Sequence, residues 1–427
     1  MNLFPHQIDA LERTKGFNNV AYYLDMGLGK TFVGSEKMYM YGNRVNLVVC
    51  QKSKVNDWVN HFLKHYSSEF LIFDLTNKTD FQIFLHNEEE SPFERIGVIN
   101  YELAWRRKEL LNLKDFTLML DESSLIQNES TKRSKFILKM HPENVILLSG
   151  TPTGGKYENL YSQLQLLGWD ITKELYWKHY IDTEWVEEDG FFRKKVIGYK
   201  NVERLKSKLA SHGAVFMKCG EAGINLPEKT IIPIEIPTTK EYKRFMKNRI
   251  VSVDGRELIG DTVLTARMYS RMLCGQYCEA KLEAFKDLAE STEDRLIVFY
   301  NFNEELVRME NIIKEMQKPI SIVNGDIKDL NAYEQYENSV TFVQYQAGAM
   351  GLNLQKANKT IYFTLPQGSE LFEQSHSRTN RIGQEKPCFY YYLICQNSVE
   401  EDILETLKIR KDYTDELFRK YEEREND

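Results

Sequence analysis

Residues 24–31 read Leu-Asp-Met-Gly-Leu-Gly-Lys-Thr, which is typical of a phosphate-binding loop. Gly27 and Gly29 lack a Cβ atom, so their backbone can adopt positive φ and approach a phosphate group closely. We expect Lys30 to contact the β- and γ-phosphates of a nucleotide and the Thr31 hydroxyl to bind Mg²⁺. The first residue is Leu where the strict motif has Gly. A glycine turn between a core strand and a helix is therefore the alternative interpretation.

A pair of carboxylates follows another apolar stretch. Asp121 and Glu122 come directly after the apolar run 116–120. Ligand-binding groups of an α/β sheet lie at the carboxyl ends of its strands. We expect Asp121 to hold Mg²⁺ and Glu122 to orient and deprotonate an attacking water. A solvated acidic turn is the alternative, but the phosphate-binding loop earlier in the chain favours nucleotide hydrolysis.

A segment that bears hydroxyl groups, Ser149-Gly150-Thr151-Pro152, follows the apolar run 145–148. We interpret Ser149 and Thr151 as a relay close to the γ-phosphate of the nucleotide. Glycine and proline also punctuate ordinary loops, so a simple connection is the alternative interpretation.

Short apolar runs alternate with helix-like segments and predict strands buried on both faces. These runs are 20–24, 45–50, 96–99, 116–120 and 145–148 in the first half, and 296–299, 319–323, 340–343, 360–363 and 389–394 in the second. The order predicts an α/β protein with two domains, each a parallel sheet flanked by helices. The predicted domains are 1–225, with a helical and hairpin insertion near 157–218, and 226–427, with a second such insertion near 240–290.

Two Asp-Gly pairs, at residues 189–190 and 254–255, predict β-hairpins. The first hairpin carries the aromatic residues Trp185 and Phe192. We interpret it as an edge hairpin that covers a helical insertion. A pin that faces DNA is the alternative.

The chain has 427 residues and a formal net charge of −7. A nucleic-acid site would therefore be a local basic patch, because bulk charge does not attract a polyanion here. Six cysteines without a Cys-x-x-Cys pair predict reduced core thiols instead of a metal site. The chain shows neither a signal peptide nor an apolar run of about 18 residues, so we expect a soluble, intracellular protein with no membrane partner.

The segment 374–384, Gln-Ser-His-Ser-Arg-Thr-Asn-Arg-Ile-Gly-Gln, matches the pattern Q-x-x-x-R-x-x-R-I-G-Q. Together with the motifs above and with Phe4-Pro5-His6-Gln7, it resembles the Snf2-type superfamily 2 helicases and DNA translocases, in particular compact members of phage and mobile elements. The resemblance extends from Leu3 to about Leu417 and implies a cytoplasmic protein of a bacterial or phage-infected cell. Ser124 departs from the family, which usually has a histidine or similar residue there, so coupling to DNA is expected to differ.

The resemblance implies two tandem RecA-like domains that bind ATP and Mg²⁺. It implies that Arg378 and Arg381 act as arginine fingers in catalysis, with Lys30, Asp121 and Glu122. The residues expected to bind ATP are Gln7, Gly27, Leu28, Gly29, Lys30, Thr31, Gly351, Arg378 and Arg381. Those expected to couple hydrolysis to motion are Ser149, Thr151 and Gln384. Those expected to contact the DNA backbone are Lys52, Ser53, Lys132, Lys135, Asn324 and Gly325.

The implied function is a DNA-dependent ATPase that translocates on single- or double-stranded DNA in replication, recombination or repair, with replication or recombination proteins as partners. Translocation on duplex DNA and true strand unwinding both remain open. The alternative from another class is an ATP-gated nucleic-acid-binding module without motor action. Glu122 argues against that alternative, because a pure switch needs no base that activates water.

Overall fold

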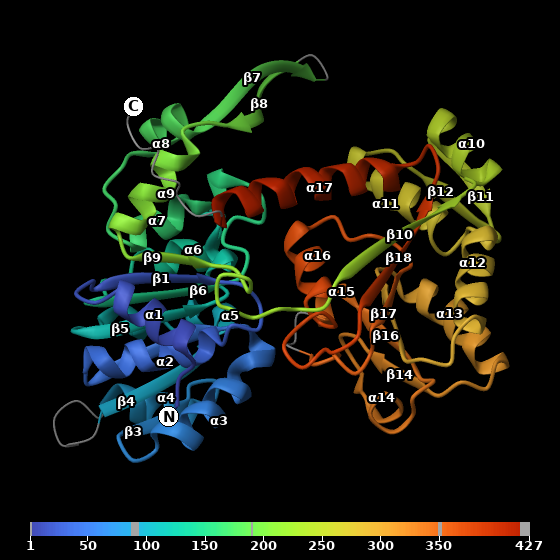
Figure 1. Cartoon of the computed structure of the whole chain (residues 1–427). Helices are drawn as coiled ribbons and strands as arrows, with labels where there is room; N and C mark the ends of the chain where they lie inside the picture. The colour runs from blue at the N-terminus through green and yellow to red at the C-terminus, as the bar shows by residue number, and fades with distance from the viewer. Residues whose placement is uncertain (1, 87–93, 189–190, 349–351, 419–427) are drawn as a thin grey trace, which may run out of the picture. The chain divides into compact units, whose positions relative to one another are not determined.

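The computed structural model describes residues 2–86, 94–188, 191–348 and 352–418. The chain forms two compact units, Met1–Ile224 with Asp412–Asp427, and Asn225–Lys411. Each unit contains its own seven-stranded sheet with helices against it (Figure 1). These sheets confirm the predicted α/β class.

The sheet of the first unit has the strand order β3-β4-β2-β5-β6-β1-β9, and every neighbouring pair is parallel. Its strands are β1 (Asn19–Leu24), β2 (Val45–Cys50), β3 (Phe70–Asp74), β4 (Glu94–Asn100), β5 (Phe116–Asp121), β6 (Asn144–Ser149) and β9 (Ala214–Met217). Tyr23 lies opposite Ser149, and Asp121 lies opposite Leu148. The carboxyl ends of β1, β5 and β6 therefore meet at one edge of the sheet.

Helices of the first unit pack their apolar side chains on this sheet. They are α1 (Pro5–Arg13), α2 (Lys30–Tyr41), α3 (Val55–Tyr66), α4 (Lys78–His86), α5 (Tyr101–Ala104), α6 (Lys132–Ile137), α7 (Tyr161–Leu166), α8 (Lys173–Tyr180) and α9 (Val202–Ser211). In α3 the buried residues Trp58, Phe62 and Tyr66 recur every four positions, which places them on one face of the helix. Single 3-10 turns complete the connections: η1 (Lys52–Lys54), η2 (Lys108–Asn112), η3 (Ser123–Ile126) and η4 (Tyr157–Leu160).

A two-stranded antiparallel hairpin, β7 (Ile181–Glu188) and β8 (Phe191–Tyr199), extends from the first unit (Figure 1). It confirms the hairpin predicted there, although the turn residues 189–190 lie outside the described residues. Trp185 and Phe192 are both largely exposed, at 66% and 69%.

The sheet of the second unit has the order β10-β18-β17-β13-β16-β14-β15. Its strands are β10 (Lys229–Ile236), β13 (Leu296–Tyr300), β14 (Ile320–Val323), β15 (Lys328–Asp329), β16 (Val340–Gln344), β17 (Lys359–Tyr362) and β18 (Cys388–Cys395). Pairing is parallel except between β14 and β15. The apolar runs of the sequence did not predict strand β10. Pro233 is compatible with that strand because β10 lies at the edge of the sheet.

Helices of the second unit are α10 (Lys240–Asn248), α11 (Val263–Cys274), α12 (Glu279–Glu290), α13 (Asn303–Glu315), α14 (Asn331–Gln335), α15 (Tyr345–Gly348), α16 (Ser369–His376) and α17 (Val399–Phe418). Strands β11 (Ile250–Val253) and β12 (Arg256–Ile259) form the second predicted hairpin. Its turn residues Asp254 and Gly255 have φ of 49° and 73°, as a type I′ turn requires.

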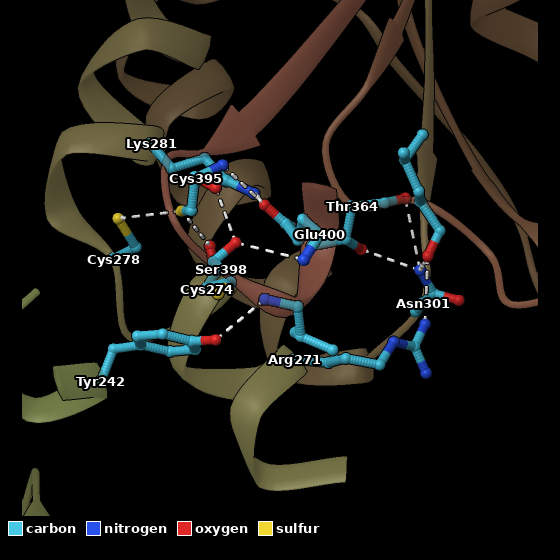
Figure 2. Close-up of polar contacts among 12 residues, drawn as sticks. Tyr242, Arg271, Cys274, Cys278, Lys281, Asn301, Thr364, Cys395, Ser398 and Glu400 are labelled. Carbon is cyan, nitrogen blue, oxygen red and sulfur yellow. Dashed lines mark hydrogen bonds and ion pairs between the residues drawn. The ribbon is translucent and has the colours of Figure 1, made fainter. Parts of the chain in front are cut away.

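A buried ion pair anchors the start of α17 in the second unit (Figure 2). The Lys281 ammonium donates to both carboxylate oxygens of Glu400 at 2.7 and 2.6 Å, and the Cys395 amide donates to the same carboxylate. Cys274, Cys395 and Glu400 place possible metal-ligand atoms within 4.8 Å of one another. Because Lys281 already engages both Glu400 oxygens, we interpret this cluster as a structural anchor.

All six cysteines lie in the described ranges, where they are buried and form no disulfide. Helix α17 ends in the first unit, whose core includes Leu417 and Phe418.

Among the helices of the described ranges, none has an apolar stretch long enough to cross a lipid bilayer.

Candidate active site and DNA-binding residues

The loop between β1 and α2 has the backbone geometry that its glycines predict. Gly27 and Gly29 have φ of 91° and 76°, and Gly29 is the N-cap of α2. A Cβ atom at Gly29 would lie 2.2 Å from Nε2 of Gln7. Both this clash and the positive φ exclude a side chain at Gly29. The open amides at the start of α2 and the helix dipole make this end of the helix suited to an anion.

Helix α1 holds this loop through two side chains. The Gln7 amide donates to the Leu28 carbonyl at 3.1 Å and accepts from the Phe4 amide at 2.9 Å. The His6 ring lies 3.0 Å from the same carbonyl oxygen. The resemblance implies that Gln7 binds ATP, and the structure places it directly on the phosphate-binding loop. The contact of His6 is an addition that no pattern in the sequence indicated.

Lys30 lies between the ends of two strands. Its ammonium donates to the Leu24 carbonyl at 3.0 Å. A Cβ atom at Gly150 would lie 3.2 Å from the same nitrogen, so Lys30 also lies against the segment that follows β6. The structure therefore brings together the predicted lysine and the predicted hydroxyl-bearing segment.

Asp121 ends β5 in a partly buried position, where side chains of other elements contact it. Trp58 donates its indole N–H to the Asp121 carboxylate at 2.8 Å. The Tyr101 hydroxyl donates to the Asp121 carbonyl at 3.0 Å. Burial raises the pKa of the Asp121 carboxyl, while the Trp58 hydrogen bond and the charge of Lys30 oppose that rise. A cation bound to this carboxylate would offset the same desolvation cost.

Glu122 has a left-handed backbone with φ of 51° and is the N-cap of η3. For a non-glycine residue this conformation costs on the order of 1 kcal/mol or more, and such residues concentrate at functional sites. Its carbonyl accepts the amide of Leu125 at 2.9 Å, which closes the turn. The unusual backbone gives this side chain a direction different from that of a residue continuing the strand.

Ser149 and Thr151 form a compact buried turn after β6. The Thr151 amide donates to the Ser149 hydroxyl oxygen at 3.1 Å. The Thr151 hydroxyl is buried and has no hydrogen-bond partner among the described residues. An unsatisfied buried hydroxyl is costly, so a second arrangement that gives it a partner would be favoured by that interaction.

The predicted DNA-binding residues of the first unit lie in two places. Lys52 and Ser53 belong to η1, directly after β2. Lys52 lines a cavity of about 450 Å³ together with Asn100 and Arg106. Arg106, which the sequence analysis did not single out, adds a positively charged side chain to the lining of this cavity.

Lys132 and Lys135 are exposed on the short helix α6. The Lys132 ammonium lies 5.2 Å from the centre of the Trp105 ring, a cation–π distance. Exposure leaves both ammonium groups accessible to a polyanion.

The predicted arginines of the second unit follow α16. Arg381 donates to the Leu352 carbonyl at 3.3 Å and to the Asn353 side chain at 2.5 Å, and burial lowers its pKa. The Arg378 carbonyl accepts the amide of Leu354 at 3.0 Å. Both arginines are thus held beside residues 352–354. Gly351, which the resemblance assigned to ATP binding, lies outside the described residues.

Gln384 has a bridging position inside the second unit. Its amide donates to the carbonyls of Gln355 and Ala357 at 3.0 and 2.8 Å, and its oxygen accepts the amides of residues 385 and 386. It fixes the segment 384–386 against residues 355–357. The predicted coupling role is compatible with this bridge.

Asn324 and Gly325 form the turn after β14. The Asn324 side chain accepts the amides of Asp326 and Ile327 at 2.9 and 2.7 Å, so its oxygen is engaged in the turn. Gly325 is exposed, and nothing in the described part of the chain lies within 4 Å of a Cβ built there. Close approach of a phosphate is sterically open at this glycine.

Two family models match the chain. A model of the SNF2-related domain matches residues 15–280, and a model of the helicase conserved C-terminal domain matches residues 280–383. The chain is 24% identical over 430 residues to the SWI/SNF-related matrix-associated actin-dependent regulator of chromatin subfamily A member 1 of Mus musculus. This alignment covers 90% of the chain and 40% of the mouse protein. It is 22% identical over 457 residues to the putative ATP-dependent helicase/translocase YwqA of Bacillus subtilis. That alignment covers 92% of this chain and 46% of YwqA.

A solved structure, the Sulfolobus solfataricus SWI2/SNF2 ATPase core in complex with dsDNA, is 19% identical and covers 97% of this chain and 92% of that chain, with a TM-score of 0.44. The chain spans less than half the length of the two curated relatives above. The match to the SNF2-related domain extends over more than half of the chain and confirms the resemblance to Snf2-type helicases and translocases. The chain belongs to the SNF2-related family of helicase-type ATPases.

Proposed function

We propose that the chain is a DNA-dependent ATPase that uses ATP hydrolysis to translocate on DNA. One observation carries the proposal: Lys30, Asp121 and the Ser149–Thr151 turn come together at the carboxyl edge of the first sheet, next to a glycine loop in positive φ. A lysine, a partly buried carboxylate and a helix N-terminus are the groups that bind and hydrolyse a nucleoside triphosphate.

The residues present fit ATP with Mg²⁺. A Cβ atom at Gly29 would clash with Gln7, so the position requires glycine. Because glycine has no side chain, the loop backbone there can approach phosphate oxygens closely. Thr31 and Asp121 supply the oxygen ligands that Mg²⁺ prefers. When bound, the ion would neutralise phosphate charge and the charge of the partly buried Asp121.

Each proposed catalytic residue has a separate task. Lys30 exchanges its bond with the Leu24 carbonyl for one with a phosphate oxygen. Glu122 orients a water molecule and accepts its proton at the carboxylate. Arg378 and Arg381 stabilise the negative charge that develops on the transferred phosphoryl group.

DNA is the proposed track, held through its phosphate backbone. The exposed Lys52, Lys132 and Lys135 support this in the first unit, with Arg106 beside Lys52. Backbone contacts of this kind are independent of sequence and weaken steeply with salt. We place the activity in DNA replication, recombination or repair, where proteins of those processes would be partners.

The direct test is ATP turnover by the full chain with single-stranded DNA, duplex DNA, RNA or no nucleic acid. We expect DNA to raise the rate severalfold, and Lys30→Ala and Glu122→Gln to abolish turnover. Binding of DNA gated by ATP without multiple-turnover phosphate release would favour the nucleotide-gated binding module. A strand-displacement assay with forked and tailed duplexes separates unwinding from translocation on intact duplex.

A further inference from the structure

Gln163 on helix α7 lies at the meeting point of three segments of the proposed active site. Its side chain is completely buried. The amide nitrogen donates to the Pro152 carbonyl at 2.9 Å. The amide oxygen accepts from the Ser123 hydroxyl at 2.8 Å and from the Tyr23 hydroxyl at 3.0 Å.

These partners are the immediate neighbours of the groups that would act on ATP. Ser123 follows Glu122, and Tyr23 lies near the end of β1, just before the phosphate-binding loop. Pro152 follows Thr151 in the segment after β6. One amide therefore connects the carboxylate turn, the strand before the loop and the hydroxyl-bearing turn.

The orientation of this amide is determined by its partners. The Pro152 carbonyl can only accept a hydrogen bond, so the nitrogen of Gln163 must face it. The oxygen then faces two hydroxyl groups, which both donate to it. Rotating the amide would break all three bonds in a buried place, which makes the link stiff.

We propose that Gln163 is a positioning residue that links the Ser149–Pro152 turn to the Asp121–Glu122 turn and so transmits the effect of DNA to ATP hydrolysis. This inference rests on the proposed function. A shift of the Pro152 carbonyl moves the Gln163 amide, which moves Ser123 and the carboxylate beside it.

The test compares substitutions on one helix. Gln163→Leu removes all three hydrogen bonds and keeps a similar volume. Gln163→Glu keeps the oxygen that accepts from Ser123 and Tyr23, but its carboxylate cannot donate to Pro152. Gln165→Leu is the matched control, because Gln165 is exposed two positions further along the chain. Leu164→Ala controls for stability, since Leu164 is fully buried in the same core.

The readouts are kcat and KM for ATP, each with and without duplex DNA, and the thermal midpoint of every variant. We expect Gln163→Leu and Gln163→Glu to lower the DNA-stimulated kcat about tenfold while KM for ATP stays within about twofold. Gln165→Leu and Leu164→Ala should keep the stimulation ratio of the unchanged chain. Equal stimulation in Gln163→Leu and Gln165→Leu would overturn the proposal, as would full stimulation in Gln163→Glu.

Ser123→Ala tests the same link without disturbing α7. It should lower DNA stimulation in the same direction, and combined with Gln163→Leu it should add little, because both changes break one connection. Additive losses would show two independent effects and contradict the link. If the unchanged chain shows no stimulation by DNA, the proposed function itself fails, which is a different outcome from a variant that alone loses stimulation.

Discussion

The indole N–H of Trp58 donates a 2.8 Å hydrogen bond to the carboxylate of Asp121. Trp58 is 2% exposed and lies on α3, whereas Asp121 ends β5. The bond holds one oxygen of this carboxylate in place. A side chain from one element thus orients a proposed catalytic group on another.

We predict that Trp58→Phe lowers kcat for ATP about tenfold, because the carboxylate loses the donor that orients it. Stability should fall by about 1–2 kcal/mol from the lost bond and the smaller ring. Steady-state ATP hydrolysis and denaturant unfolding measure the two effects. Trp169→Phe is the control, since Trp169 stacks on His212 away from the carboxylates. Equal losses of activity in both variants would contradict the orienting role.

The two loop glycines should respond differently to a methyl group. Gly29→Ala combines a strained φ with a Cβ 2.2 Å from Gln7 Nε2, whereas Gly27→Ala meets only the strained φ in the described surroundings. We expect Gly29→Ala to weaken ATP binding more than Gly27→Ala, and the Gln7→Ala/Gly29→Ala double variant to recover part of the loss. Equilibrium binding of a fluorescent ATP analogue gives the comparison. If Gly27→Ala is the weaker binder, close packing of Gln7 is not what constrains the loop.

Glu305 on α13 should make the second unit less stable as pH rises. Burial raises the pKa of this carboxyl from 4.5 to about 7, against hydrogen bonds from the amides of Asn301 and Phe302 and from Thr364. The folded state therefore holds the proton more tightly than the unfolded state. The contribution of Glu305 to the free energy of unfolding is full below about pH 4.5 and is lost as pH rises through about 7. The change amounts to about 3 kcal/mol.

Glu305→Gln keeps the acceptor oxygen and removes this titration. We expect the difference in unfolding free energy between Glu305→Gln and the unchanged chain to grow from pH 5 to pH 7.5, with the variant the more stable at the higher pH. Denaturant unfolding at both pH values gives the result. The lowered pKa of His61, about 4, applies to both proteins and cancels in the comparison. A difference that is independent of pH would refute the prediction.

The buried pair Lys281–Glu400 should be essential to the second unit (Figure 2). The two side chains are 0% and 2% exposed, so removing one leaves the other charged and desolvated. We expect Lys281→Met to lower the free energy of unfolding by about 3 kcal/mol or more. Lys286→Met is the control because the Lys286–Glu290 pair is exposed, and it should change stability by less than about 1 kcal/mol. Similar losses in the two variants would show that burial of the pair does not matter.

The strands that the sequence predicted best are those with continuous apolar runs. Val45–Cys50 is a strand over the predicted range, because its side chains are buried on both faces. Strand β10 was missed because its burial alternates, with exposed residues such as Lys229 and Glu235, and because it contains Pro233. An edge strand needs no continuous apolar run, so its pattern resembles that of a connection.

The candidate site shows the same contrast between features with a local sequence pattern and features that depend on the whole fold. Local spacing was sufficient to predict a glycine loop before Lys30 and a strand that ends at the pair Asp121 and Glu122, because each motif lies within a few residues. Gln163 was missed, since its partner Tyr23 is 140 positions away in the chain. A buried glutamine in a short helix carries no local signal, and only the fold brings its partners together.

The most direct measurement of the central claim is multiple-turnover phosphate release by the full chain, with and without duplex DNA, compared with Glu122→Gln. The proposed function predicts a severalfold rise in rate with DNA for the unchanged chain and no turnover in the variant, which still binds ATP. Equal rates with and without DNA, or turnover that survives Glu122→Gln, would contradict it.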